Sequence, residues 1–248
     1  MNLTLASSLL ITFSLSASAI AKTIKFAAQD SPPFNYLDGK TVKGASIDIM
    51  KKVCEKLKWT CELEIIPQKR GLAMAEAGEI DGVWGILQIP EREKYLTHSV
   101  PTWTSNLNYM GIKGVTAPVT KPEELKGFTI AGVRASAAFK KAEEIKSKAT
   151  DVKLVEVNTY PDAFKALFEN SYGPKGVVIS YDDVGNFLAK QNKFDKLITV
   201  FNAEQVQFRV GFSKKSDAQL VTDFNKTIEA MRASGELKAI LAPYSMNQ

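Results

Sequence analysis

Apolar and polar residues alternate in short blocks along the chain, and most blocks suit either a strand or a helix. Short apolar runs bounded by turn residues predict strands, whereas apolar residues recurring every three or four positions predict helices. We expect strands at residues 23–28, 60–66, 82–87, 107–112, 128–133, 153–157, 176–180, 197–200 and 207–212. We expect helices at residues 47–57, 71–77, 137–148, 160–168 and 182–191, and from 220 until Gly235. This alternation predicts an α/β fold with mainly parallel sheets.

Three predicted helices begin at polar residues that can cap a helix. Thr120 with Glu123, and Ser216 with Gln219, have the spacing of a capping box, the first of them before a short helix. Thr159, followed by a proline two residues later, is typical of a helix N-terminus. No stretch rich in proline, glycine and serine divides the chain. We therefore expect two lobes crossed by several strands rather than two independent domains.

The first 21 residues are typical of a secretory signal peptide. They contain no charged side chain, residues 9–15 form a short apolar core, and residues 19–21 form a small-residue cleavage site. A basic residue before the apolar core is missing. The alternative is a buried or membrane-spanning helix, which suits the segment less well because its apolar core is short and diluted by serine and threonine. We therefore expect a periplasmic protein.

The chain contains two cysteines, Cys54 and Cys61. In an oxidising compartment we expect them to form a disulfide. One continuous helix would hold them about 10 Å apart, beyond the roughly 7 Å between Cα atoms that a disulfide allows. The helix should therefore end near Leu57, and residues 58–59 should turn the chain back. The alternatives are two buried thiols or a redox pair, and the spacing disfavours the latter because it is not Cys-x-x-Cys.

The charge and the motifs argue against most catalytic and nucleic-acid functions. A net charge of +5 favours anionic partners, but no basic stripe with interleaved aromatic residues indicates nucleic acid. His98 is the only histidine, so we expect no metal site and interpret His98 as structural rather than as part of a catalytic triad. Phosphate-binding glycine motifs are missing, and no cofactor is expected. Asp182 and Asp183 could be an acid–base pair, but their position favours helix capping, with one of them facing a cleft.

One arginine follows a predicted strand at a position where a carboxylate could be bound. Residues 78–82 lead into the strand at 82–87, and Pro90, Glu91 and Arg92 form a charged turn after it. Arginine binds carboxylates well because it donates two parallel, charge-assisted hydrogen bonds. The alternative for Arg92 is a surface salt bridge with Glu91 or Glu93. We expect ligand contact.

The order of several short motifs resembles that of the extracellular solute-binding proteins of family 3, the polar amino-acid type. These motifs span nearly all of the chain after the leader, at residues 24–27, 32–34, 44–48, 78–81, 90–92, 99–101, 125–127 and 235–237. The chain is most similar to the histidine-binding and lysine/arginine/ornithine-binding members. The spacing of Cys54 and Cys61 also matches a disulfide of the histidine-binding members.

This resemblance implies a two-lobed, type II periplasmic-binding-protein fold. Each lobe would be a mainly parallel sheet flanked by helices, and two crossing hinge segments would join the lobes. Residues 22–110 and 209–248 would form lobe 1, and residues 111–208 lobe 2. A small carboxylate-bearing solute, an amino acid or a related organic acid, would bind between the lobes and close them. The implied partner is the permease of an ABC transporter, and we expect a monomer.

The resemblance also implies ligand-binding residues on both lobes. They are Asp30, Phe34, Arg70, Trp84, Gly85, Leu87, Gln88, Arg92, Arg134, Ser136, Ala137, Tyr181 and Asp182. Arg92 corresponds to the family's carboxylate-binding arginine. Trp84 is expected either to stack on the ligand or to fill the core. Tyr181 stands where the family has an acid for the ligand's ammonium group.

Other positions also depart from the family pattern. Leu87 and Gln88 replace the usual threonine or serine, Ser31 replaces an aromatic residue, and residues 135–137 replace a Gly-Thr-Thr turn. With Arg70 and Arg134 nearby, the cleft is rich in arginine and poor in ammonium acceptors. We therefore expect an anion or dianion as the ligand rather than a standard zwitterion.

Two functions other than transport stay open. One is an enzyme on the same scaffold, resembling the periplasmic cyclohexadienyl dehydratases, with Asp182 or Asp30 as the acid. The other is a soluble solute sensor that docks on a membrane receptor. We expect the transport binding protein, which is not an enzyme, and assign no catalytic residue.

Overall fold

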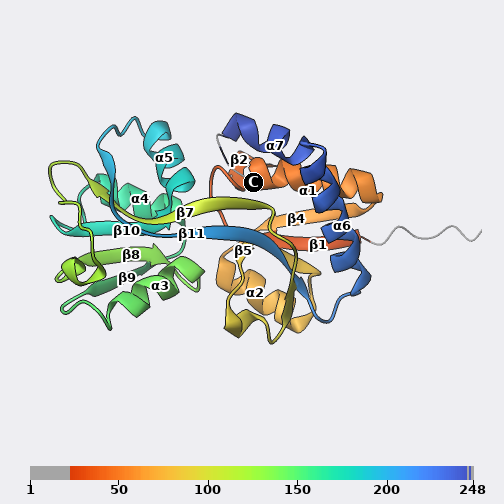
Figure 1. The fold of residues 1–248 in the computed structure, drawn as a ribbon, viewed down its shortest axis with the longest axis horizontal. Helices are drawn as coiled ribbons and strands as arrows, with labels where there is room; N and C mark the ends of the chain where they lie inside the picture. Colours follow the sequence, from red (N-terminus) through yellow and green to blue (C-terminus); the bar gives the residue numbers. More distant parts are fainter. Residues whose placement is uncertain (1–22, 245, 247–248) are drawn as a thin grey trace, which may run out of the picture.

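The computed structural model describes residues 23–244 and 246, which form two lobes joined by two long strands (Figure 1). The predicted leader lies outside these residues. The elements of lobe 1 are β1 (Thr23–Ala28), β2 (Tyr36–Asp38), β3 (Thr41–Lys43), α1 (Ala45–Leu57), β4 (Thr60–Ile65), α2 (Gln68–Ala77), β5 (Gly82–Leu87), the 3₁₀ turn η1 (Pro90–Arg92), β6 (Leu96–His98), α6 (Gln219–Ala233), α7 (Glu236–Leu241) and η3 (Ala242–Tyr244).

Lobe 2 is built from the middle of the chain. Its elements are η2 (Pro122–Leu125), β8 (Thr129–Val133), α3 (Ala137–Ile145), β9 (Lys153–Val157), α4 (Tyr160–Phe168), β10 (Gly176–Tyr181) and α5 (Asp182–Gln191). The strands β7 (Trp103–Ile112) and β11 (Leu197–Ser213) cross between the lobes (Figure 1). The predicted boundaries near residues 110 and 208 fall inside these crossing strands and stay a prediction.

The strands of the described chain join in one mixed sheet that runs through both lobes, except β2 and β3, which pair only with each other. Its order is β4-β1-β5-β11-β7-β10-β8-β9, with β6 also paired to β11. Strands β4, β1 and β5 are parallel in lobe 1, and β10, β8 and β9 are parallel in lobe 2. The crossing strands pair antiparallel with each other and with their neighbours. The expectation of mainly parallel sheets therefore holds within each lobe but not at their junction.

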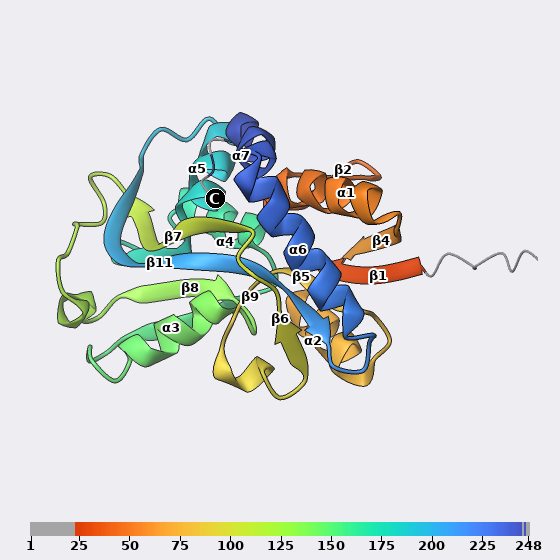
Figure 2. The same cartoon turned by 45° about the vertical axis from the view of Figure 1, so that its right-hand side comes forward.

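Helices cover both faces of the sheet in each lobe. In lobe 1, α1, α6 and α7 pack together on one side and α2 packs on β1 and β5 on the other (Figures 1 and 2). In lobe 2, α4 and α5 pack together on one side while α3 lies on the other (Figure 1). The buried face of α6 carries Leu220, Phe224, Ile228 and Met231, the residues whose helical spacing predicts this helix.

Several predicted elements differ from the structure. The strands expected at residues 197–200 and 207–212 are one strand, β11, because the polar residues between them pair with β7 through shifts in register. The short strands β2, β3 and β6 were not predicted. The first predicted capping box instead uses Glu124, whose carboxylate accepts from the N–H groups of Thr120 and Lys121. At α6, Asp217 rather than Ser216 accepts from the N–H of Gln219.

The disulfide between Cys54 and Cys61 is present, with the Cα atoms 6.3 Å apart. Helix α1 ends at Leu57, and Lys58 has a φ of 54°, in the left-handed region that reverses the chain. Strand β4 then carries Cys61 back alongside the helix. The predicted turn is therefore confirmed.

Candidate ligand-binding site

The carboxyl ends of the parallel strands from both lobes face each other across the junction. In lobe 1, residues 29–35 follow β1 and η1 follows β5; in lobe 2, residues 134–136 follow β8 and Tyr181 ends β10. Ligands of α/β proteins bind outside the carboxyl ends of parallel strands, where loops and helix N-termini converge. The junction is therefore the candidate site.

The loop after β1 is held in place by the start of α1. Gly44 has a φ of 127°, and a Cβ atom there would lie 2.2 Å from the carbonyl oxygen of Phe34, so only glycine fits. Ser46 donates to that carbonyl oxygen and to Asn35 Oδ1, each at 2.9 Å. The Phe34 ring then packs on the crossing strands, with its centroid 5.3 Å from that of the Trp103 ring and 5.0 Å from that of the Phe208 ring. The loop is thereby anchored against the strands that join the lobes.

Arg92 lies buried where the lobes meet, with 2% of its surface exposed. Its Nη1 donates to the carbonyl oxygen of Leu87 in lobe 1 at 2.9 Å, and its Nη2 donates to that of Ala135 in lobe 2 at 3.1 Å. Burial lowers the pKa of its guanidinium from the usual value. Within the described chain no carboxylate forms an ion pair with Arg92, since Glu91 pairs with Lys140 and Glu93 accepts from Gln88. The surface salt bridge considered for Arg92 is therefore absent.

Two tyrosines and small polar groups surround this arginine. Tyr181 is buried and lies close enough to Arg92 for each group to affect the pKa of the other. Burial raises the pKa of the Tyr181 hydroxyl to about 12. Tyr160 is fully buried beside Tyr181, Ser136 and Gln29, and burial raises the pKa of its hydroxyl well above the usual value. The Tyr160 hydroxyl and Gln29 Oε1 are buried without a hydrogen-bond partner. The junction thus holds neutral hydroxyl groups and one buried cation.

Asp30 is the acidic residue of the loop after β1. Burial, and then the charge of Asp162 in α4, raise the pKa of its carboxyl from the usual value. Its Oδ1 is buried without a hydrogen-bond partner. Asp30 lines a groove of about 430 Å³ between the β2–β3 hairpin and helices α4 and α5. This is one of several openings around the junction.

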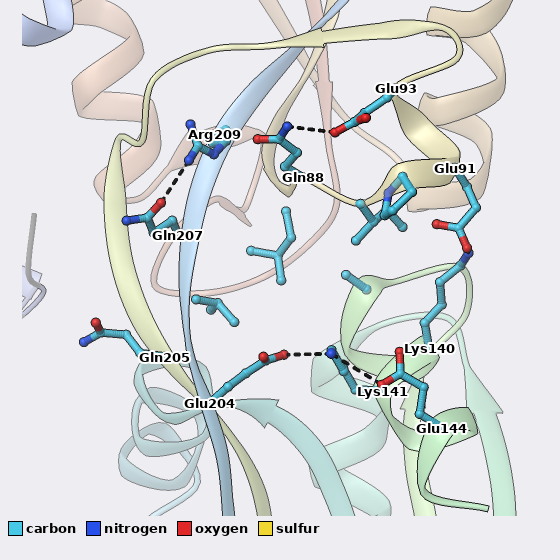
Figure 3. Close-up of a pocket in the computed structure, with 15 residues that line it drawn as sticks. Gln88, Glu91, Glu93, Lys140, Lys141, Glu144, Glu204, Gln205, Gln207 and Arg209 are labelled. Carbon is cyan, nitrogen blue, oxygen red and sulfur yellow. Dashed lines mark hydrogen bonds and ion pairs between the residues drawn. The ribbon is translucent and has the colours of Figure 1, made fainter. Parts of the chain in front are cut away.

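A larger groove of about 740 Å³ opens between η1 and α3 on one side and β11 on the other (Figure 3). Leu87 and Ala137 contribute apolar surface, and charged side chains form the rim. Lys140 binds Glu91 at 2.5 Å across the lobes, and Lys141 lies 3.5 Å from Glu204 of β11. The Lys140–Glu91 pair links the two lobes on this side, whereas the Lys141–Glu204 pair joins α3 to the crossing strand β11.

Arg70 and Arg134 line a third groove of about 390 Å³. Arg70 lies in the first turn of α2, and Arg134 follows β8 in the other lobe. The Nε of Arg134 is 2.6 Å from Glu156 Oε2, and both side chains of that pair are about half exposed. The groove is therefore cationic on both sides.

The family of the chain follows from a comparison with protein-family models. The model of the bacterial extracellular solute-binding proteins, family 3, matches residues 24–247. The chain belongs to this family. Membership implies a secreted or periplasmic location, and no helix among the described residues is long and apolar enough to cross a membrane.

The relatives of this solute-binding protein are distant in sequence. The arginine-binding extracellular protein ArtP of Bacillus subtilis (strain 168) is 24% identical over 93% of this chain and 92% of its own length. An ancestral arginine-binding protein bound to arginine has a TM-score of 0.81 and 21% identity, covering 90% of this chain and 97% of that one. A histidine kinase sensor domain with similarity to periplasmic binding proteins also has a TM-score of 0.81, at 20% identity, covering 92% and 98%. These structural likenesses show the fold.

The predicted ligand-binding residues of this solute-binding protein do not all face one space. Four of them are buried at the junction: Arg92, Ser136, Tyr181 and Phe34. The others line separate openings: the groove beside α3 contains Leu87, Gln88 and Ala137, the cationic groove contains Arg70 and Arg134, and the groove beside the β2–β3 hairpin contains Asp30. Trp84 instead lies in the core of lobe 1, 5.5 Å from Phe26 and from Phe224 in edge-on contacts. Its position fits core filling rather than stacking on a ligand. Gly85, the next residue, packs against Trp103, and a Cβ atom at this position would lie 3.3 Å from the Trp103 side chain.

Asp182 binds a crossing strand and, with Asp183 and Tyr244, also lines a groove of about 740 Å³. Its carboxylate accepts from Ser105 Oγ at 2.9 Å and from Asn106 Nδ2 at 2.9 Å, both on β7. It also accepts from the N–H of Asp183. Helix α5 begins at Asp182, its N-cap is Tyr181 and no side chain caps it, so the capping interpretation of this pair is wrong. Both carboxylates lie in the first turn of the helix, where the helix dipole favours negative charge. Burial, with the neighbouring charge of Asp182, raises the pKa of Asp183 to about 6, although Ser105 also donates to it.

Sequence reasoning missed several polar residues of the junction. They are Gln29, Gln68, Asn158 and Tyr160. Gln68 lay outside the helix predicted at 71–77, because α2 starts three residues earlier. Tyr160 follows the capping Thr159, and the sequence placed it only at the start of the helix predicted at residues 160–168. The rule that residues after parallel strands line a site could have identified Gln29 and Asn158.

No group of three or more metal-ligating side chains comes together within the described residues.

Proposed function

We propose that the chain binds a small solute with a carboxylate, an amino acid or related organic acid, between its lobes and delivers it to an ABC transporter. The observation that carries the ligand class is Arg92. A buried guanidinium costs free energy unless an anion and hydrogen bonds compensate it. Arginine has five N–H donors, and the carbonyl oxygens of Leu87 and Ala135 use two of them. The remaining donors suit a carboxylate.

Closure of the lobes around the solute is part of this proposal. Arg92 and the Glu91–Lys140 pair both connect one lobe to the other. A carboxylate held by Arg92 would add contacts on both sides of the junction and so favour the arrangement in which the lobes are together. The transporter would then recognise this arrangement. Family membership and the binding proteins among the relatives support this role.

A binding screen with a matched control tests the proposal. The mature protein is titrated calorimetrically with the standard amino acids and with small mono- and dicarboxylates. We expect at least one carboxylate to bind at micromolar concentration or below and Arg92→Met to abolish the signal. Arg232→Met is the control, because Arg232 also donates to a backbone carbonyl, that of Pro101, but lies on α6. Binding that survives Arg92→Met would contradict the proposal.

A further inference from the structure

The cationic groove beside Arg92 has a composition that selects between ligands. Its lining in lobe 1 is Pro67, Gln68, Lys69, Arg70 and Ala73, and its lining in lobe 2 is Arg134 and Asn158. Three cations and no carboxylate therefore face about 390 Å³ of space. Lys69 and Arg70 form no ion pair within the described chain, and Arg134 shares its charge with the half-exposed Glu156. An arginine or lysine side chain would meet three cations there, of which only Arg134 is paired with a carboxylate.

The start of α2 adds to this preference for an anion. The helix is 10 residues long and begins at Gln68, after Pro67, without a side-chain cap. The N–H groups of Arg70 and Gly71 donate to the carbonyl oxygen of Pro67, which leaves those of Gln68 and Lys69 at the start of the helix, where the helix dipole favours negative charge. Gln68 is 93% buried, lines the groove, and has an Oε1 atom without a hydrogen-bond partner. Because the two ends of an amide are interchangeable by rotation, this side chain is placed to bind a ligand that carries hydrogen-bonding groups.

The groove adjoins the carboxylate site along the chain. Arg134 immediately precedes Ala135, whose carbonyl oxygen accepts the hydrogen bond from Arg92. The N–H of Arg134 in turn donates to the carbonyl oxygen of Val157 at 2.9 Å, which fixes Asn158 beside it. Arg92 contacts the residue after Arg134, and Arg134 lines the cationic groove, so the peptide between Arg134 and Ala135 connects the two sites.

We propose that this groove binds a second acidic group, so that the solute is a compound with two acidic groups, such as an acidic amino acid or a dicarboxylate. This inference rests on the proposed function, because it needs Arg92 to hold the first carboxylate. It separates this chain from relatives that are named for arginine binding, and it assigns Arg70, Arg134 and Gln68 to specificity.

Four probes of similar size test the inference by calorimetry: L-glutamate, glutarate, L-glutamine and L-arginine. We expect L-glutamate or glutarate to bind at least about tenfold tighter than L-glutamine, which corresponds to about 1.4 kcal/mol, and L-arginine to bind more weakly still. Raising the salt concentration should reduce this preference, because exposed charges are screened. L-Glutamine or L-arginine binding as tightly as the diacids would overturn the inference while leaving the proposed function intact. Binding of none of the four would overturn the inference, and the wider carboxylate screen would then decide the proposed function separately.

Variants assign the preference to the groove. The double variant Arg70→Gln with Arg134→Gln should bring the diacid and L-glutamine affinities within about threefold of each other, without weakening L-glutamine. Lys146→Gln with Lys148→Gln removes the same charge from exposed positions after α3 and should leave the preference unchanged. Arg92→Met should weaken every probe, which distinguishes loss of the carboxylate site from loss of the groove. A full diacid preference in the Arg70/Arg134 variant would contradict the inference.

Discussion

Replacing Arg92 by methionine should abolish ligand binding while changing the stability of the free protein little. The substitution removes two hydrogen bonds from a charged donor, which contribute roughly 1.5–3 kcal/mol each. It also removes the cost of burying a guanidinium without an ion pair, which is several kcal/mol. The two effects oppose each other. We therefore expect the free energy of unfolding of the ligand-free variant to lie within about 1 kcal/mol of the unmodified protein, or roughly 4 °C in Tm.

The ligand-bound state should behave differently. At 100 times its Kd, a ligand that binds only the folded state adds about 2.7 kcal/mol of stability, which raises Tm by roughly 5–11 °C for a protein of this size. Removing one partner of a buried charge pair costs about 2–5 kcal/mol of binding, or at least about 30-fold in Kd. At the same ligand concentration, the shift in Arg92→Met should therefore be at most about 3 °C.

Thermal unfolding measures both the Tm of the ligand-free protein and the shift in Tm that the ligand causes. The ligand is the carboxylate that stabilises the unmodified protein most. Arg232→Met is the control and should keep the full ligand-induced shift. If Arg92→Met lowers the Tm of the ligand-free protein by more than about 10 °C, Arg92 has a structural role. If the variant keeps the full shift, the ligand carboxylate is held elsewhere.

Three other substitutions test the structure through its stability. Burial, and then the charge of Arg92, lower the pKa of His98 to about 4; Glu93, Arg209 and Lys214 are also near it. The stability that the neutral imidazole contributes is complete above about pH 6.5 and is lost as the pH falls towards 4. His98→Gln should therefore unfold less readily in acid than the unmodified protein, as measured by chemical denaturation. The pKa of Asp183 is raised to about 6, so its ionised form destabilises the fold above that pH, and this cost disappears as the pH falls from 6 towards 4. Asp183→Asn should therefore stabilise the protein at pH 7.5 but little at pH 4.5. Asp195→Asn, at an exposed position, is the control and should show no such difference. The double variant Cys54→Ser with Cys61→Ser removes the disulfide, whose cysteines are 7 residues apart in sequence. It should lower the free energy of unfolding, measured with denaturant, by roughly 2–3 kcal/mol. A stability equal to that of the oxidised protein would show that the disulfide contributes nothing.

The sequence predicted the layers of the fold because most strands and helices have a clear apolar period. Strand β11 was missed as one element because its middle section crosses between lobes, where side chains alternate poorly between core and solvent. Arg92 could be singled out because a lone arginine follows a buried strand. Its contact with Ala135, 43 residues away, could not, because that contact depends on how the two lobes pack.

The sequence said less about which side chains face the junction. Trp84 and Leu87 lie on one strand, yet Trp84 is in the core and Leu87 lines a groove. Both faces of this strand are covered, so alternation does not distinguish them. Gln68 and Tyr160 could not be predicted because each lies at a helix start, where the exact first residue decides which way the side chain points.

A crystal structure of the protein with its tightest-binding carboxylate tests the central claim most directly. We expect the ligand between the lobes, with two carboxylate oxygens about 2.7–2.9 Å from nitrogen atoms of Arg92. A ligand bound outside the junction, or one between the lobes whose carboxylate does not contact Arg92, would contradict the account.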